Sequence, residues 1–234
     1  MMLEILKPPT TNLDELSKIQ RKIAKQVIKE DKTGDINTIA GCDISFSKGN
    51  QACAASVLLQ YPDLKELDHW TEEVEVDFPY IPTYLAFREL EPMLKVLDDV
   101  EADVYMIGAQ GLAHPRRAGL ASHLGAIIDK PTLGVAKNIL CGEAKEPEPE
   151  KGSYTLLKDK GETIGATVRT RSNVKPVYVS IGHKVSLEKA IEIALKTAPK
   201  YKLPEPIRAA HNLATKAMKE NPDRSLMKKL TDFR

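Results

Sequence analysis

The chain has 234 residues, of which 42% are hydrophobic and 29% are charged. This size and composition suit one soluble globular domain with a full core and exclude a disordered chain. The formal net charge of +1 argues against a protein that coats nucleic acid through bulk electrostatics, but it is compatible with a local basic lining.

The first half of the chain predicts a helix, three strands and a second helix. Residues 12–30 place aliphatic side chains at three- and four-residue spacings after Asn12, which is a good helix cap. A second helical pattern, at residues 83–97, follows the Pro79-Tyr80-Ile81-Pro82 loop. Between them, turns at Lys48-Gly49-Asn50 and Tyr61-Pro62-Asp63 divide β-like runs that predict an antiparallel meander: 38–46, 52–59 and 65–76.

The second half has an α/β pattern. Apolar runs at 104–107 and 132–135 flank a small-residue helix at 119–128, an order that predicts two parallel strands. After a Glu/Pro/Lys loop at 144–151, two helices follow three further predicted strands: 154–157, 163–169 and 177–181. We therefore expect an α/β fold with a mixed central sheet flanked by helices, in a single domain of residues 1–234.

Cysteine usage and the N-terminal segment bear on the cellular compartment. Cys42, Cys53 and Cys141 are odd in number and lack a C-x-x-C spacing, which favours neither a disulfide framework nor a zinc site. The first ten residues contain no signal-peptide core, and no apolar run approaches the ~20 residues that span a bilayer. We expect a cytoplasmic protein without a membrane partner.

Two carboxylates stand out as candidate metal ligands. Asp43 interrupts a run that otherwise reads as a central strand, and a buried carboxylate is costly unless it is paired or bound to a metal. Glu89 follows Phe87-Arg88 on the predicted second helix, which can pack on the sheet near Asp43, and Mg²⁺ prefers such oxygen ligands. The alternative is an outward-facing strand residue and a solvated helix residue.

Two basic segments follow the carboxyl ends of the predicted parallel strands. The segment 111–117 contains His114, Arg116 and Arg117, and Lys137 ends Gly-Val-Ala-Lys. Because such strands end at the same edge of a sheet, the charges should converge on a groove that binds a phosphate backbone. For 111–117, a polar loop with a helix start at Pro115 is the alternative.

Two further features can belong to the same site. The Pro79–Pro82 loop presents Tyr80 and Ile81 on a stiff backbone, a composition suited to wedging between bases; an inward-packed hydrophobic turn is the alternative. His211 lies one helical turn after Arg208, so both can face one site, although a lone helical histidine is usually structural.

Taken together, these segments resemble the endonuclease V family. The matching segments occur in family order with family-like spacing between about residues 10 and 217: 41–46, 79–89, 111–119, 121–123, 134–137, 182–183 and 204–211. The joint occurrence of PYIP, F-R-E, HPRR and GVAK is far more specific than any one motif. The resemblance implies an RNase H-like core and cleavage, dependent on Mg²⁺ or Mn²⁺, of the second phosphodiester bond 3′ to a deoxyinosine, leaving 3′-hydroxyl and 5′-phosphate ends.

The resemblance also implies residue roles and partners. Asp43 and Glu89 correspond to metal ligands, and Lys137 and His211 to catalytic-site groups. Residues matching the family's DNA- and lesion-binding positions are Tyr80, Ile81, Pro82, Arg88, Gly111, Leu112, His114, Arg116 and His123. Tyr80 would be the wedge, Gly111 and His114 would lie near the lesion base, and Arg88 and Arg116 would hold phosphate. The implied partner is inosine-containing DNA, with RNA as the substrate of some relatives, and we expect a monomer.

The chain departs from the family pattern at one position. The family carries a further catalytic aspartate in a D-G-x-G setting, whereas this sequence reads Gly108-Ala109-Gln110-Gly111. Gln110 or His114 can supply a neutral ligand but no negative charge, so Mg²⁺ should bind more weakly. The competing hypotheses are an active or weakened endonuclease, a binder of inosine-containing nucleic acid that has lost cleavage, and a purely structural scaffold, which would leave PYIP and the basic loops unexplained.

Overall fold

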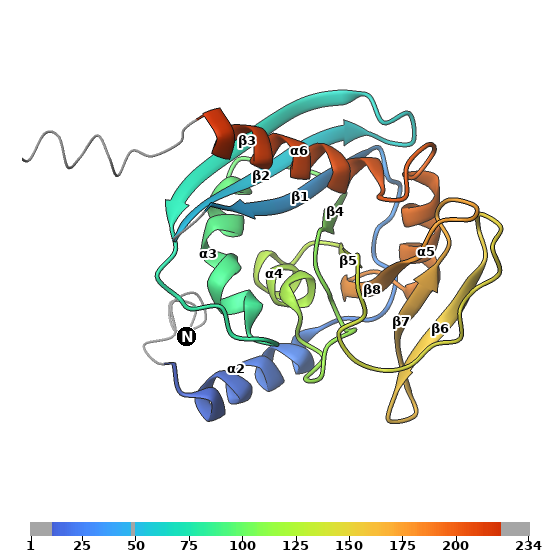
Figure 1. Cartoon of the computed structure of the whole chain (residues 1–234), viewed down its shortest axis with the longest axis horizontal. Helices are drawn as coiled ribbons and strands as arrows, with labels where there is room; N and C mark the ends of the chain where they lie inside the picture. Colours follow the sequence, from blue (N-terminus) through green and yellow to red (C-terminus); the bar gives the residue numbers. More distant parts are fainter. Residues whose placement is uncertain (1–10, 48–49, 221–234) are drawn as a thin grey trace, which may run out of the picture.

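The computed structural model describes residues 11–47 and 50–220, and Figure 1 shows one twisted sheet with helices against both faces. Residues 1–10, in which no export signal is predicted, and the predicted turn residues Lys48 and Gly49 lie outside this range. The strands are β1 (Thr38–Phe46), β2 (Gln51–Gln60), β3 (Glu66–Glu75), β4 (Val104–Ile107), β5 (Thr132–Ala136), β6 (Tyr154–Asp159), β7 (Glu162–Val168) and β8 (Val177–His183).

The sheet order is β3-β2-β1-β4-β5-β8-β7-β6. β1, β2 and β3 form the predicted antiparallel meander, and β4 and β5 run parallel to each other as predicted. β4 also pairs in parallel with β1, which the sequence did not predict. β8, β7 and β6 complete the sheet by antiparallel pairing. The prediction of a mixed, RNase H-like sheet is therefore confirmed, and the chain leaves β4 and β5 at the edge toward which β1 also runs.

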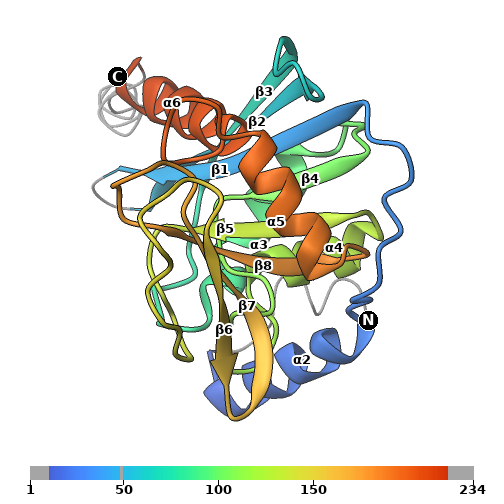
Figure 2. The ribbon, with the colours of Figure 1, turned by 90° about the vertical axis from the view of Figure 1, so that its right-hand side faces the viewer.

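Helices cover both faces of this sheet (Figure 2). The described helices are α2 (Leu13–Gln26), α3 (Leu85–Val96), α4 (Leu120–Ile128), α5 (Leu187–Lys196) and α6 (Glu205–Glu220). Alternate residues of the central strands face opposite sides: Ile39 and Val104 belong to the core under α5 and α6, and Ala40 and Tyr105 to the core under α3 and α4. Among the described residues, no helix has both the length and the apolarity to cross a bilayer.

α2 ends earlier than its sequence pattern predicts. Asn12 caps the helix as expected, because its side chain accepts hydrogen bonds from the amides of Asp14 and Glu15. The chain then turns extended at Val27, and the Ile28 amide donates to Nδ1 of His183 at 3.2 Å. The aliphatic residues at 27 and 28 thus serve a tertiary contact with the end of β8 rather than a longer helix.

Gly41 lets α6 lie directly on β1. A Cβ atom at this position would stand 2.0 Å from the carbonyl oxygen of Pro206, in the first turn of α6. Only glycine leaves room for such an approach of helix backbone to strand backbone. Because side chains alternate along a strand, Asp43 lies on the same side of β1 as Gly41, beneath the next turns of α6.

Candidate active site

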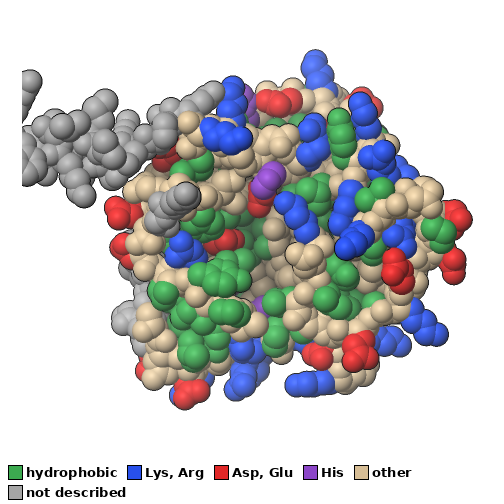
Figure 3. Space-filling view, in the orientation of Figure 1, with side chains coloured by type: hydrophobic (Ala, Val, Ile, Leu, Met, Phe, Trp, Pro, Cys, Tyr) green, Lys and Arg blue, Asp and Glu red, His purple; other side chains and the backbone are tan. Residues whose placement is uncertain are grey.

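A cavity of ≈ 410 Å³ opens where β1, β4 and β5 end (Figure 3). One wall is the Pro79–Pro82 loop with the start of α3, and another is α6. Its lining includes Gly108 and predicted site residues from five separate segments of the chain: Asp43, Tyr80, Ile81, Pro82, His114, Lys137 and His211. Tyr80 is 71% exposed at this wall, so the loop is not an inward-packed turn at that residue.

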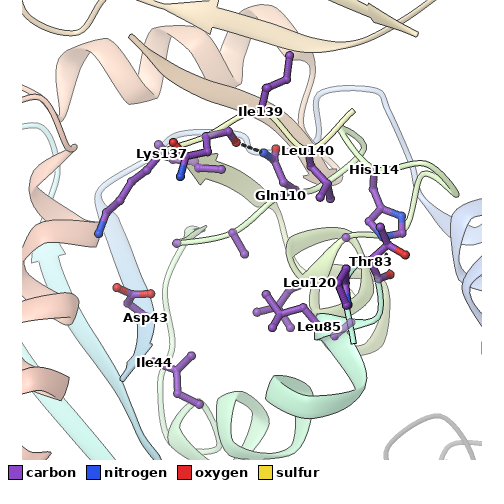
Figure 4. A pocket seen from close by; sticks show the side chains of 18 of the residues that line it. Asp43, Ile44, Thr83, Leu85, Gln110, His114, Leu120, Lys137, Ile139 and Leu140 are labelled. Atoms are coloured by element: carbon purple, nitrogen blue, oxygen red, sulfur yellow. Dashed lines mark hydrogen bonds between the residues drawn. The ribbon is translucent and has the colours of Figure 1, made fainter. Parts of the chain in front are cut away.

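Asp43 and His211 form a hydrogen-bonded pair at one end of the cavity. Nδ1 of His211 donates to Oδ2 of Asp43 at 2.8 Å. Burial raises the pKa of the Asp43 carboxyl, while the bond to His211 and the charge of Lys137 act in the opposite direction. Figure 4 shows the Lys137 side chain extending toward Asp43 from the loop after β5. Three elements, β1, α6 and the β5 end, thus contribute one group each.

Glu89 adds a second carboxylate near Asp43, from within α3. It is buried, and its pKa is raised to about 8, first by burial and then by the negative charge of Asp43, with Arg88 acting in the opposite direction. Two carboxylates that repel each other in a poorly solvated place are stabilised by a cation. Their oxygen donors fit a hard divalent ion such as Mg²⁺ or Mn²⁺.

The donor set is small. Within the part of the chain that the structure describes, no group of three or more His, Cys, Asp or Glu residues is arranged to hold a metal ion. The strand register explains the importance of Gly108: Cys42 pairs with Ile107, so Gly108 lies level with Asp43. A Cβ atom on Gly108 would stand 2.6 Å from Oδ1 of Asp43. A side chain at position 108 would therefore point at the Asp43 carboxylate, and glycine supplies no ligand there.

Thr83 organises the opposite end of the cavity. Its φ of +67° lies in the left-handed region, which a β-branched residue rarely adopts. The Thr83 carbonyl accepts hydrogen bonds from Nε2 of Gln20 at 3.0 Å, Nε2 of His114 at 2.8 Å and Nη2 of Arg116 at 2.8 Å. Arg116 also donates to the Thr83 hydroxyl at 2.7 Å and to the side-chain oxygen of Gln20. These contacts hold the chain directly after the Pro79–Pro82 loop.

His114 is neutral in this network. Its Nε2 must carry the proton that it donates to the Thr83 carbonyl, and its Nδ1 accepts from the Arg116 amide at 3.2 Å. The pKa of His114 is lowered to about 4, first by burial and also by the charges of Arg116 and Arg117, while the hydrogen bond to Thr83 acts in the opposite direction. The side chain therefore contributes a fixed hydrogen-bonding wall rather than a positive charge.

Several predicted site residues lie outside the cavity lining, and buried Glu89 is one of them. Arg88 donates to the Phe78 carbonyl, stacks 4.5 Å from the Phe46 ring centroid and borders a separate cavity. His123 is fully buried with its ring edge-on to Phe87 at 5.5 Å. Leu112 is buried, Gly111 packs against the backbone of β8, and the Arg116 guanidinium is engaged by Thr83 and Gln20.

Sequence reasoning missed Gln20, Thr83 and the structural part played by Gln110. Gln20 occupies an inward position of the α2 stripe between Leu16 and Ile23, and a buried polar residue in such a stripe is a usable signal. Gln110 donates to the Asn138 carbonyl at 2.8 Å, which ties together the loops after β4 and β5 (Figure 4). Nothing in the local sequence marks Thr83, because its conformation depends on partners distant in the chain.

Comparison with known proteins gives a consistent result. The family model described as Endonuclease V matches residues 21–212. A protein named Endonuclease V from Methanothrix thermoacetophila is 50% identical over 204 residues, covering 87% of this chain and 91% of the relative.

Solved structures agree with the sequence matches. The crystal structure of the Endonuclease V from Streptomyces avermitilis has a TM-score of 0.85 and 36% identity, covering 91% of this chain and 95% of that one. Endonuclease V of Ciona intestinalis, solved in complex with a 24mer DNA containing an inosine followed by a ribo-adenosine, has a TM-score of 0.78 and 29% identity, covering 89% and 98%.

Proposed function

The chain belongs to the endonuclease V family of nucleases, and from this premise we propose that it recognises deoxyinosine in DNA and hydrolyses the second phosphodiester bond 3′ to it. The observation that carries the proposal is the cavity. Asp43, Lys137 and His211 line one end of it, and the exposed Tyr80 lies on the wall formed by the Pro79–Pro82 loop. The groups suited to reacting with a phosphate and the side chain suited to wedging between bases thus line the same cavity.

The residues of the Asp43 end divide the chemistry among them. Asp43 and Glu89 would hold a divalent cation, Mg²⁺ or Mn²⁺, which when bound activates water and offsets charge on the reacting phosphate. Asp43 fixes the His211 ring through Nδ1, which leaves Nε2 as the nitrogen that accepts the proton of the attacking water. The Lys137 ammonium neutralises charge that develops on the phosphate oxygens.

The products follow from the direction of attack. The water oxygen forms a bond to phosphorus as the bond from phosphorus to the 3′-oxygen breaks. One fragment therefore ends in a 3′-hydroxyl and the other in a 5′-phosphate. The base is recognised and left attached to its sugar, so the reaction opens the strand for later repair.

Cleavage of a labelled inosine-containing strand, in Mg²⁺ and separately in Mn²⁺, tests this function. We expect the wild-type protein to cut one bond removed from the inosine on its 3′ side and to leave a matched adenosine strand intact. Asp43→Asn should abolish cutting while the protein stays folded by circular dichroism. Equal cutting of both strands, or cutting that survives Asp43→Asn, would refute the proposal.

A second candidate function is recognition of inosine with weakened or lost cleavage. Gly108 favours it, because a side chain at this position would point at the Asp43 carboxylate, and glycine gives no ligand there. Mg²⁺ requires near-octahedral geometry, so two carboxylates hold it less firmly than three. Binding and cleavage scored in parallel separate the candidates: selective binding of the inosine strand without a cut strand identifies the second.

The remaining parts of the proposal concern partners and compartment. We take the protein to be a single-domain monomer that acts in the cytoplasm, with inosine-containing RNA as an alternative substrate. The three cysteines are free, which suits a reducing compartment. The same cleavage assay with deoxyinosine and inosine strands of equal sequence decides between DNA and RNA.

A further inference from the structure

Three lysines gather beside the Asp43 end of the cavity. Lys137 lines the cavity, and Lys202 immediately precedes Leu203, which also lines it. The pKa of Lys202 is lowered first by burial and then by the positive charges of Lys175 and Lys137, so both of these ammonium groups lie near that of Lys202. Figure 3 shows Lys and Arg side chains clustered next to the hollow. We name Lys137, Lys175 and Lys202 the lysine edge.

The members of the lysine edge have no ion-pair partners among the described residues, although the Asp43 carboxyl lies toward Lys137. Lys189 and Lys196, in contrast, both pair with Glu192. Like charges held together without counter-ions repel each other and destabilise the free protein. An anionic ligand that spans all three removes this cost.

The backbone that carries Lys175 is fixed in advance. Arg169 is 5% exposed and donates to the carbonyls of Val174 at 2.6 Å and Pro147 at 2.7 Å. The loop between β7 and β8 is thereby held against the 144–151 segment. Lys175 consequently projects from a defined position and not from a loose loop.

The segment that carries Lys202 is fixed by the same loop. The Thr170 hydroxyl donates to the Lys202 carbonyl, and Nζ of Lys151 donates to the Ala198 carbonyl at 2.7 Å. Two loops far apart in the sequence thus form one edge. A regular array of phosphates suits such fixed, separated point charges better than a single small anion does.

We propose that the lysine edge binds phosphates of the nucleic acid strand on the 3′ side of the cleaved bond. This rests on the proposed function, because the direction depends on where the lesion and the cut lie. With the base at the Tyr80 wall and the cut near Asp43, a strand cut 3′ to the lesion continues past Lys137. Lys202 lies close to both Lys137 and Lys175, so such a strand would meet these charges as it leaves the cavity.

The salt dependence of binding tests the proposal. The probe is a single-stranded inosine oligonucleotide, bound in EDTA by the full chain and by the Lys175→Gln/Lys202→Gln variant. Each phosphate contact contributes about 0.7 to the slope of log affinity against log salt concentration for a single strand. We therefore expect the slope of the double variant to be shallower by roughly 1.4. An unchanged slope would overturn the proposal.

A matched control is Lys65→Gln/Lys130→Gln, which removes the same charge at the opposite end of the sheet, where β1 and β5 begin. This control should keep the wild-type slope. An oligonucleotide shortened on the 3′ side should erase the difference between wild type and Lys175→Gln/Lys202→Gln, and one shortened on the 5′ side should keep it. If shortening on the 5′ side erases the difference instead, or if the control flattens the slope equally, the proposal is overturned. Loss of inosine preference in the wild-type protein would refute the proposed function instead.

Discussion

At the Thr83 end of the cavity one carbonyl accepts three hydrogen bonds from the protein, whereas at the Asp43 end two carboxylates lie close enough for the charge of one to raise the pKa of the other. The first arrangement is complete without a ligand and fixes a wall. The second arrangement leaves the negative charge of two carboxylates, which a bound cation would offset. A nuclease needs both: a preformed surface for the base and a reactive end whose stability depends on cation and phosphate.

Gly108→Asp should have the largest effect, because it changes the Asp43 end of the cavity and leaves the Thr83 end as it is. The new carboxylate would enter the space beside Asp43, displacing only the flexible end of that side chain, and would add a third oxygen ligand. We expect cleavage of an inosine strand in Mg²⁺ to rise by two to three orders of magnitude, about the effect of one well-placed electrostatic group. Rates measured at rising Mg²⁺ should also saturate at lower concentration.

Gly108→Asn is the matched control for this gain. Asparagine has nearly the same shape as aspartate but no negative charge, so it should bring a small fraction of the increase. Equal rates for the two variants would show that volume, not charge, is what position 108 lacks. Faster cleavage by the wild type than by Gly108→Asp would mean that glycine there suits the reaction.

Gly41→Ala should break the Asp43 end without touching its chemistry. The added methyl group collides with the Pro206 carbonyl and must push α6 away from β1, which separates His211 from Asp43. We expect a loss of about 2 to 3 kcal/mol in the free energy of unfolding, with cleavage lost at temperatures where the variant is still folded. Urea denaturation and the cleavage assay measure the two effects.

Leu90→Ala tests whether cleavage depends on overall stability or on the position of α6 and His211. Leu90 belongs to α3 and is fully buried in the core on the side of the sheet away from α6, and its truncation costs about 2 to 5 kcal/mol. Activity well below its melting temperature should nevertheless survive. If Leu90→Ala and Gly41→Ala lose cleavage equally, the contact of α6 with Gly41 has no special part in holding His211.

The Asp43 end and the Thr83 end also differ in how far the sequence predicts them. Strand periodicity and the rule that parallel strands end at one edge predict that the segments after β4 and β5 meet, and His114 and Lys137 do line one cavity. The lack of an acid at position 108 is visible in the sequence itself. Its consequence is not, because only the β1–β4 register shows that a side chain there would meet Asp43.

The Thr83 end is less predictable, for a physical reason. Gln20, Thr83 and Arg116 come from segments separated by 33 to 96 positions, and their hydrogen bonds depend on the packing of α2 against the loops. Arg116 looks like a phosphate ligand in a basic motif, yet in the structure it is held by Thr83 and Gln20. Composition cannot tell a charge directed outward from one used internally.

Acid should loosen the Thr83 end selectively. The pKa of His114 is about 4 in the folded protein, below its value of about 6.5 in an unfolded chain, so the unfolded state takes up the proton first as pH falls. Stability from this group is complete above pH ~6.5 and is lost toward pH ~4, by about 2 kcal/mol between pH 7 and 5. Urea denaturation across this range measures it.

His114→Gln isolates this contribution, because glutamine can still donate to the Thr83 carbonyl but does not titrate. Buried His123, whose pKa is lowered to about 3 first by burial and then by the charge of His114, destabilises the fold in acid in the same direction, and burial still lowers its pKa in the variant. Between pH 7 and 5, the wild type should therefore lose ~2 kcal/mol more unfolding free energy than His114→Gln does. Parallel pH profiles for the two proteins would contradict the neutral, buried state of His114.

The smallest effect concerns the bond between Gln20 and Arg116. Gln20→Ala removes both an acceptor for Arg116 and a donor to the Thr83 carbonyl, and Arg116→Ala removes the opposite partner. In a double-mutant cycle, we expect the two losses in unfolding free energy to be non-additive by about 1 kcal/mol, the size of one hydrogen bond to a charged group in a partly exposed place. Additive losses would mean that each residue holds Thr83 on its own.

If Arg116 instead served mainly to bind phosphate, Arg116→Ala would weaken nucleic acid binding and flatten its salt dependence with little change in stability. Gln20→Ala would not share that effect.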